Sequence, residues 1–156
     1  MILGIIADTH DNLPKIKKAI ELFNKKYTKL VLHAGDWVAP FSVFNFNRLT
    51  CPYLGVYGNN DGEKDGLREK SLGKIKEAPL ELEQFGKKIL ITHDLTKTNL
   101  TKNYDIVIFG HTHKPEIYTK NSSLFINPGE CCGWLTGQSN VVILDLISMS
   151  AKIHRI

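Results

Sequence analysis

Residues 5–12 read IIADTHDN, in which an apolar run breaks directly into an Asp-x-His pair and then into a polar turn. This pattern predicts a buried strand whose carboxyl end carries two side chains able to bind metal. Residues i and i+2 of an extended chain point to the same side, so the Asp8 carboxylate and the His10 imidazole can reach one ion together. An isolated Asp-x-His pair is common by chance, and its meaning depends on the residues at the ends of the other strands.

The segments after this opening strand predict a βαβ unit. Asn12 is placed to cap a helix that runs to about Lys26 with apolar residues at helical spacing. A second apolar strand at 29–33 then ends in the sequence Ala-Gly-Asp at 34–36. A strand, helix and strand of these lengths favour a right-handed crossover between parallel strands.

The rest of the chain predicts further short strands and little helix. A short helix is expected at 40–47, a strand at 53–57, a loop with some helix at 62–73 and a buried strand at 106–109. Hairpins are expected within 80–92 and 115–126, and closing antiparallel strands at 141–146 and 151–156. This order indicates an α/β domain of two packed mixed sheets with helices outside.

Length and composition indicate one ordinary globular domain. The 156 residues suit a single domain, 1–156, that can bury its own core. The hydrophobic fraction is 42% and the charged fraction 23%, both typical of soluble proteins. The net charge of +4 comes from scattered lysines without a long basic or basic-aromatic tract. We therefore expect no stable nucleic-acid binding.

The cysteines and the apolar segments bear on compartment. Cys51, Cys131 and Cys132 have no Cys-x-x-Cys spacing, so we expect neither a zinc knuckle nor a disulfide framework. Reduced thiols fit a cytosolic protein. The N-terminal apolar run is too short for a signal peptide or a membrane span. We expect a cytoplasmic protein with no membrane partner, and the sequence leaves open whether it forms a homo-oligomer.

Side chains that can bind metal recur where apolar strands end. In open α/β sheets, ligands gather outside the carboxyl ends of strands, so we expect these side chains to converge. Their mixed nitrogen and oxygen donors suit Mn, Fe, Zn or Ni. Two divalent ions held partly by carboxylates would leave a cationic centre that attracts a phosphate oxyanion. The candidates are Asp8, His10, Asp36, Asn59, Asn60, His93, His111 and His113.

The combined pattern resembles the calcineurin-like metallophosphoesterases, above all the small single-domain bacterial and archaeal phosphodiesterases. The residues that carry the resemblance are Asp8-x-His10, Gly35-Asp36, Gly58-Asn59-x-Asp61, His93, Gly110-His111-x-His113 and Asn127-Pro128-Gly129. The resemblance implies a four-layer αββα sandwich of two mixed β-sheets flanked by helices. It also implies that one ion is held by Asp8, His10 and His113, the other by Asn59, His93 and His111, and that Asp36 bridges them.

The resemblance further implies a metal-dependent phosphoesterase. We expect a phosphodiesterase that cleaves a small phosphodiester through a metal-bridging hydroxide, with His10, Asp36 and Asn60 next to the reacting phosphate. The expected cofactors are two divalent ions, with Mn²⁺ favoured and Ni²⁺, Fe²⁺ or Zn²⁺ as alternatives. The alternative functions are a phosphomonoesterase, a nuclease, or a non-catalytic scaffold such as the retromer subunit that resembles this fold.

Three positions depart from the family pattern. Asn60 stands where many relatives carry a histidine that is thought to assist the leaving group, and an amide can donate a hydrogen bond but cannot act as a general acid. We therefore expect a preference for leaving groups that depart without strong protonation. His93 is flanked by Thr92 and Asp94, where a glycine-flanked histidine is usual. The segment 93–105 is also too short for the helix that many relatives carry, which would open one flank of the site.

Other polar and aromatic residues are predicted to have supporting roles. His33 precedes the Asp36 turn on an apolar strand and is expected to be hydrogen-bonded in the core or behind a ligand. Asp11 and Asp61 are expected to cap turns or support ligands. For the thiols of residues 131 and 132, just after the turn at 127–129, we favour ordinary packing over an approach to the site. The aromatic residues expected in the core are Trp37, Phe41, Phe44 and Phe46.

Overall fold

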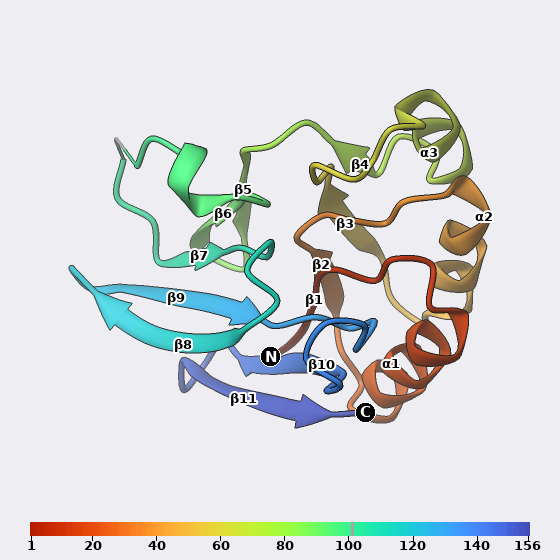
Figure 1. Cartoon of the computed structure of the whole chain (residues 1–156). Coiled ribbons are helices and arrows are strands. Elements are labelled where there is room, and N and C mark those ends of the chain that lie inside the picture. The colour runs from red at the N-terminus through yellow and green to blue at the C-terminus, as the bar shows by residue number, and fades with distance from the viewer. Residues whose placement is uncertain (101) are drawn as a thin grey trace.

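Two mixed β-sheets pack face to face, and helices cover the outer side of one of them (Figure 1). The computed structural model of the chain describes residues 1–100 and 102–156. Residue 101, which belongs to the segment predicted to be too short for a helix, lies outside the described residues. None of the described helices has the length and hydrophobicity that a membrane crossing requires.

The six-stranded sheet contains the βαβ unit that opens the chain, and its strand order is β11-β10-β1-β2-β3-β4. The strands β1 to β4 are parallel to one another, whereas β10 pairs antiparallel with β1, and β11 pairs antiparallel with β10 at the sheet edge. The two-residue strand β4 lies in a segment without a clear sequence pattern. The bounds are β1 Ile2–Ile6, β2 Leu30–His33, β3 Tyr53–Val56, β4 Ile75–Lys76, β10 Asn140–Asp145 and β11 Ser150–Arg155.

The five-stranded sheet has the order β5-β6-β7-β9-β8. Its inner strands β6, β7 and β9 are parallel, and the edge strands β5 and β8 join it as the predicted hairpins. The bounds are β5 Leu80–Gln84, β6 Lys87–Ile91, β7 Ile106–Ile108, β8 Pro115–Lys120 and β9 Ser123–Pro128. The predicted fold class of two mixed sheets in an α/β sandwich is therefore confirmed.

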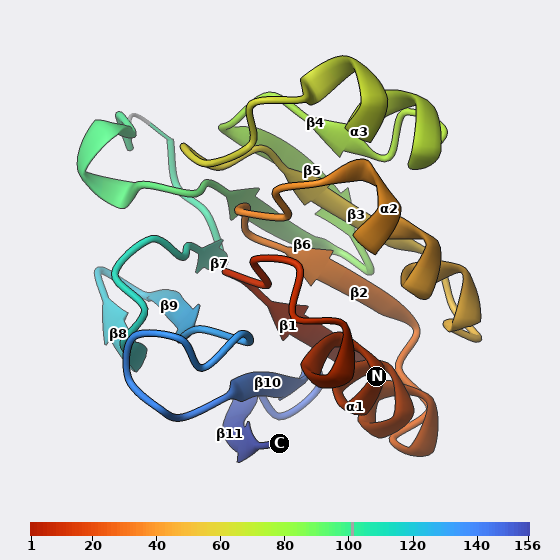
Figure 2. The ribbon, with the colours of Figure 1, turned by 45° about the vertical axis from the view of Figure 1, so that its right-hand side comes forward.

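The helices lie outside the six-stranded sheet, as the turned view of Figure 2 also shows. The bounds are α1 Leu13–Lys25, α2 Pro40–Val43, η1 Phe44–Arg48 and α3 Lys64–Lys70. The Asn12 side chain accepts the backbone N–H of Lys15 and so caps α1 as predicted. In the described part of segment 93–105, the only helical element is the short 3₁₀ turn η2, Leu95–Lys97. The outer layer over the five-stranded sheet is therefore much thinner.

The core has two parts, one between the sheets and one beneath the helices. Residues such as Ile5, Leu32 and Ile108 alternate inward and fill the space between the sheets. Trp37 and Phe46 are buried beneath the helices as predicted. The prediction was wrong for Phe41 and Phe44, which are each 53% exposed because the short α2–η1 segment buries only one side.

Strand register brings the polar turns of both sheets to one edge. The Asp8 N–H donates to the Gly35 carbonyl at 3.0 Å, which joins the turn after β1 to the turn after β2. The Gly110 N–H donates to the His93 carbonyl at 3.0 Å, which joins the turns after β7 and β6. The carboxyl ends of these strands carry the predicted ligands, so the fold gathers them as expected for open α/β sheets.

Candidate metal centre

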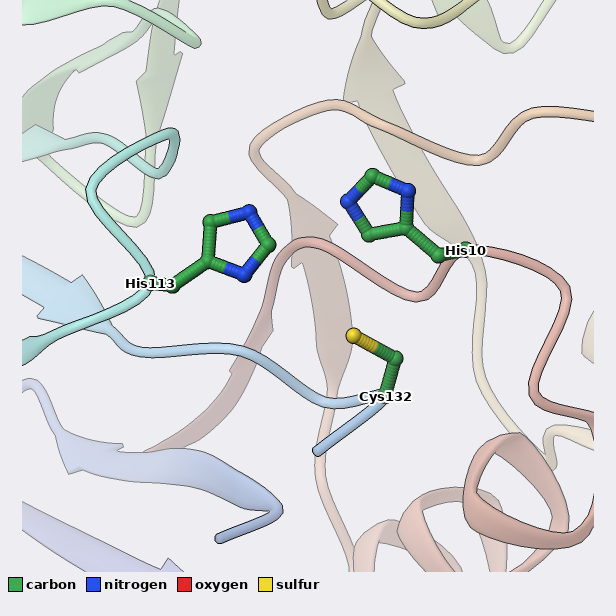
Figure 3. Close-up of side chains that lie close together, drawn as sticks. All are labelled: His10, His113 and Cys132. Carbon is green, nitrogen blue, oxygen red and sulfur yellow. The ribbon is translucent and has the colours of Figure 1, made fainter. Parts of the chain in front are cut away.

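The structure brings four of the candidate ligands into one cluster. Asp8, His10, Asp36 and His113 each offer an atom within 4.8 Å of the others'. They come from the turns after β1, β2 and β7, so the cluster joins both sheets. In Figure 3 the imidazole rings of His10 and His113 face each other across a gap, and their centroids are 5.3 Å apart.

The backbone of these turns has an uncommon conformation. Left-handed backbone is rare for residues with a side chain, and it persists where the surrounding structure enforces it, often at functional sites. Here it aims side chains from several turns at one region. The five candidate ligands with positive φ are Asp8 (50°), His10 (37°), Asp36 (62°), His111 (68°) and His113 (61°).

The Asp36 carboxylate lies between two groups of donors. Its Oδ2 is 3.4 Å from His10 Nε2 on one side and 3.5 Å from His93 Nε2 on the other. His93 is only 4% exposed, and its Nε2 is 2.9 Å from Asn59 Oδ1. The other ring nitrogen of His93 is 2.9 Å from the Ala34 carbonyl, which fixes the ring. His93 therefore lies at the site although it is flanked by threonine and aspartate in place of the usual glycine.

His111 forms the outer part of the second group. Its ring meets the His93 ring edge-on, with centroids 5.1 Å apart. The His111 side chain is 42% exposed, and its Nε2 is 3.9 Å from Asp94 Oδ2. The structure thus places His111 next to His93, and Asp94 next to both.

Two glycines make this close packing possible. A Cβ at Gly58 would overlap Asp36 Oδ1. A Cβ at Gly35 would lie 2.6 Å from His93 Nδ1, and the Gly35 φ of +98° is one that few other residues adopt. Both glycines are therefore required for the positions of Asp36 and His93.

The donor atoms at the centre fit a cation. Asp8 Oδ2 and His10 Nε2 are buried and find no hydrogen-bond partner among the residues that the structure describes. Buried polar atoms are nearly always satisfied, and both of these can offer a lone pair. Burial, and then the neighbouring Asp36 carboxylate, raise the pKa of Asp8 to about 8. A bound cation would compensate both effects, and imidazole with carboxylate donors suits first-row divalent metals.

Further buried polar residues support the ligands as predicted. His33 is fully buried and stacks on Trp37 with ring centroids 3.6 Å apart. Its Nε2 is 3.1 Å from Thr9 Oγ1, in the turn between Asp8 and His10. Burial lowers the pKa of His33 well below its ordinary value, so it stays neutral. Asp61 accepts the backbone N–H of Asp36 at 3.1 Å, so it holds the turn that carries the central carboxylate.

Asn60 contacts the central carboxylate directly. Its backbone N–H donates to Asp36 Oδ1 at 2.9 Å, and its side-chain amide donates to Asp36 Oδ2 at 2.8 Å. The residue itself is exposed. Asn60 thus lies at the mouth of the centre, and its contact with substrate stays a prediction.

Sequence reasoning missed Glu130, which is fully buried behind His113. Glu130 Oε2 is 3.0 Å from His113 Nδ1 and accepts the Cys132 thiol at 3.0 Å. Burial opposes ionisation of Glu130, but hydrogen bonds from Thr136, His113 and Cys132 together lower its pKa to about 2. The available signal was its place directly after the Asn127-Pro128-Gly129 turn, which the resemblance had already associated with the site.

The two adjacent cysteines have different surroundings. Cys131 packs in the core beneath the helices, as predicted. For Cys132 the expectation of ordinary packing needs correction, because its sulfur lies with His10 and His113 in a group whose ligand atoms are within 4.8 Å of one another (Figure 3). The backbone N–H of Cys132 donates to the Asp8 carbonyl at 3.0 Å, and this pairing draws the thiol toward the centre.

Comparison with known proteins agrees with the geometry. Residues 1–149 match the model of the calcineurin-like phosphoesterase superfamily domain. The chain belongs to this superfamily. This calcineurin-like phosphoesterase is 41% identical over 154 residues to a phosphodiesterase of Methanocaldococcus jannaschii, and the match covers 93% of each chain.

Solved structures of similar proteins agree with this family assignment. A structure of an archaeal phosphodiesterase superposes with a TM-score of 0.90 at 38% identity and covers 100% of both chains. Vps29 of Entamoeba histolytica in complex with Zn²⁺ has a TM-score of 0.71 at 20% identity and covers 100% of this chain and 98% of its own. The last similarity shows a shared fold alone.

Proposed function

We propose that this calcineurin-like phosphoesterase is a phosphodiesterase that hydrolyses a small phosphodiester with the help of two divalent ions. The observation that carries the proposal is the position of Asp36, whose Oδ2 is 3.4 Å from His10 Nε2 and 3.5 Å from His93 Nε2. A carboxylate between two groups of imidazoles is suited to bridge two cations. The 41% identity to an archaeal protein named as a phosphodiesterase supports the choice of reaction.

The proposed ligands form two groups, one on each side of the Asp36 carboxylate. Asp36 would touch both ions, and Mn²⁺ is the metal we favour, with Ni²⁺, Fe²⁺ and Zn²⁺ as alternatives. Asp8 Oδ2 and His10 Nε2, which are buried and have no hydrogen-bond partner within the described part of the chain, support a cation on the first side. The first ion would take Asp8, His10 and His113, and the second would take Asn59, His93 and His111.

When bound, the ions supply Lewis acidity toward the phosphoryl group and activate water as the nucleophile. The ligand residues of the chain would hold the ions and offset part of their charge. Two carboxylates, Asp8 and Asp36, offset only part of four positive charges, so the centre keeps a net attraction for a phosphate. His10 is only partly buried, and next to the bound phosphate it would stabilise charge on the phosphoryl group.

The proposed role of Asn60 depends on its amide. The Nδ2 group now donates to Asp36 Oδ2 at 2.8 Å, and from this position it can donate to a phosphoryl oxygen. It has no proton to give to a leaving alkoxide at neutral pH. The site should therefore favour esters with stable leaving anions. Asn60→His should raise turnover of an alkyl monoester relative to an aryl diester, and an unchanged ratio would contradict this role.

The experiment that tests the function compares an aryl phosphodiester with the corresponding aryl monoester in the presence of Mn²⁺, Ni²⁺, Zn²⁺, Fe²⁺ or Mg²⁺. We expect metal-dependent cleavage of the diester in preference to the monoester, and its loss in Asp36→Ala. Circular dichroism of the variant checks that it folds. If no metal raises turnover above that of the variant, the scaffold alternative is favoured instead.

A further inference from the structure

One tryptophan lies exposed beside the metal centre. Trp134, in the loop between β9 and β10, is 65% exposed, whereas Trp37 is fully buried. The Trp134 indole N–H donates to the backbone carbonyl of His10 at 3.3 Å. The exposed ring is therefore held against the turn that carries a candidate ligand. Large aromatic residues are normally buried for most of their area, so this exposure calls for an explanation.

The loop around Trp134 is anchored although its apolar side chains are uncovered. The backbone N–H of Leu135 and the hydroxyl of Thr136 donate to Glu130 at 3.1 Å and 2.6 Å. At the start of the loop, the Asn12 amide donates to the Cys132 carbonyl at 2.7 Å. The Leu135 side chain is nonetheless 75% exposed. A rigid aromatic surface binds a partner at little cost in conformational entropy.

We propose that Trp134 and Leu135 bind a nucleobase on the group that stays attached to the phosphate, so that the phosphodiesters cleaved are nucleotide esters. The inference rests on the proposed function. The indole and the metal centre meet at His10, so a group on Trp134 belongs to the molecule whose phosphate lies at the centre. The loop 133–137 reads GWLTG and has no charged side chain. Such a surface suits a flat, uncharged ring and accepts any base, because every base has a π-face.

The test uses two diesters with the same leaving group. The p-nitrophenyl ester of thymidine 5′-phosphate and methyl p-nitrophenyl phosphate both release nitrophenolate and differ only in the group retained. Stacking of a base on an aromatic side chain strengthens binding by about 5- to 150-fold. The kcat/KM of the thymidine ester should therefore exceed that of the methyl ester by a factor within this range. Trp134→Ala should bring the ratio close to one, and Trp134→Phe should keep most of it.

The variants separate stacking from a merely structural role. If Trp134 only held the His10 turn, both variants, which lack the indole N–H, would lose turnover of both esters alike, and Trp134→Ala would keep the wild-type ratio. That result would overturn the inference. Ile147→Ala is the matched control, because this side chain is 84% exposed in the turn between β10 and β11, and it should not alter the ratio.

A binding measurement keeps the inference separate from the proposed function. Thymidine 5′-monophosphate should bind the metal-loaded protein about 5- to 150-fold more tightly than methyl phosphate, and the difference should vanish in Trp134→Ala. Absence of diester turnover with this binding difference present would refute the proposed function alone. Turnover of both esters with equal kcat/KM, and equal binding of both monoesters, would refute the role of Trp134 alone.

Discussion

Replacement of Glu130 by glutamine tests how the centre is organised. Glu130 Oε2 is 3.0 Å from both His113 Nδ1 and Cys132 Sγ. Oε1 accepts the backbone N–H and the hydroxyl of Thr136. All of these partners donate hydrogen bonds to the carboxylate, because an ionised carboxylate can only accept them. As long as His113 donates from Nδ1, its Nε2 keeps a lone pair, and Nε2 is the atom 3.7 Å from Asp8 Oδ1.

A glutamine at this position cannot satisfy the same partners. If its NH₂ group takes the place of Oε2, it meets His113 Nδ1, and His113 must move its proton to Nε2 to accept a hydrogen bond. If the NH₂ group takes the place of Oε1, it opposes the Thr136 N–H. Each buried polar group left without a partner costs about 1–3 kcal/mol, and loss of the carboxylate behind a metal-binding histidine typically costs about 10–100-fold in metal affinity.

The assay is metal binding measured by competition with a chelator, together with urea unfolding of the metal-free protein. We expect Glu130→Gln to lose about 10–100-fold in metal affinity and about 1–3 kcal/mol in free energy of unfolding. Thr136→Ala is the matched control, because it removes one partner of Glu130 without touching His113. It should lower stability but leave metal affinity near that of the wild type.

Two outcomes would contradict this role of Glu130. If Glu130→Gln binds metal as tightly as the wild type, the carboxylate does not orient His113. If Thr136→Ala loses as much metal affinity as Glu130→Gln, the effect comes from general loosening of the loop. Nitrogen NMR of the histidine rings gives a direct readout. The proton of His113 should be on Nδ1 in the wild type, and on Nε2 in Glu130→Gln when the new NH₂ group faces His113.

Three further predictions concern packing and protons. A Cβ at Gly58 would overlap Asp36 Oδ1, so Gly58→Ala should weaken metal binding by about 10–100-fold; Gly62→Ala, which has open space around it, should leave a calorimetric metal titration unchanged. The pKa of Asp8 is raised from an ordinary 3.8 to about 8, so between these pH values the folded state holds a proton that the unfolded state has lost. The metal-free protein should therefore lose stability as pH rises from 3.8 to about 8. Metal affinity should rise by up to tenfold per pH unit until about pH 8, and a flat profile in titrations from about pH 6 to 9 would contradict this. Leu32 is fully buried between the sheets, so Leu32→Ala should cost about 2–5 kcal/mol in urea unfolding.

Much of the fold could be predicted because its signals are local. The apolar run before Asp8, the capped helix after it and the strand before Asp36 are each defined by neighbouring residues with period 2 or 3.6. The two-residue strand β4 could not be predicted, because it exists only through pairing with β3. The exposure of Phe41 and Phe44 could not be predicted either. Apolar spacing shows that a helix face can be buried, but it does not show whether another element covers that face.

For the site, the sequence by itself determined the kinds of donor and their places at strand ends. The i, i+2 spacing of Asp8 and His10, and of His111 and His113, identified candidate ligands before any contact was known. Only the tertiary structure decided that Asp36 lies between His10 and His93. That arrangement depends on the register of strands from both sheets, and no local pattern encodes register between distant strands.

The same limit explains the residues that sequence reasoning missed. Glu130 and Trp134 belong to a loop without metal-ligand spacing. The sequence of such a loop does not show that the carboxylate is buried and the indole exposed. The Cys132 N–H pairs with the Asp8 carbonyl, and the Trp134 indole donates to the His10 carbonyl across 124 positions of sequence. These hydrogen bonds place the loop at the centre. The sequence determined which side chains can bind metal, and tertiary pairing decided which residues surround and orient them.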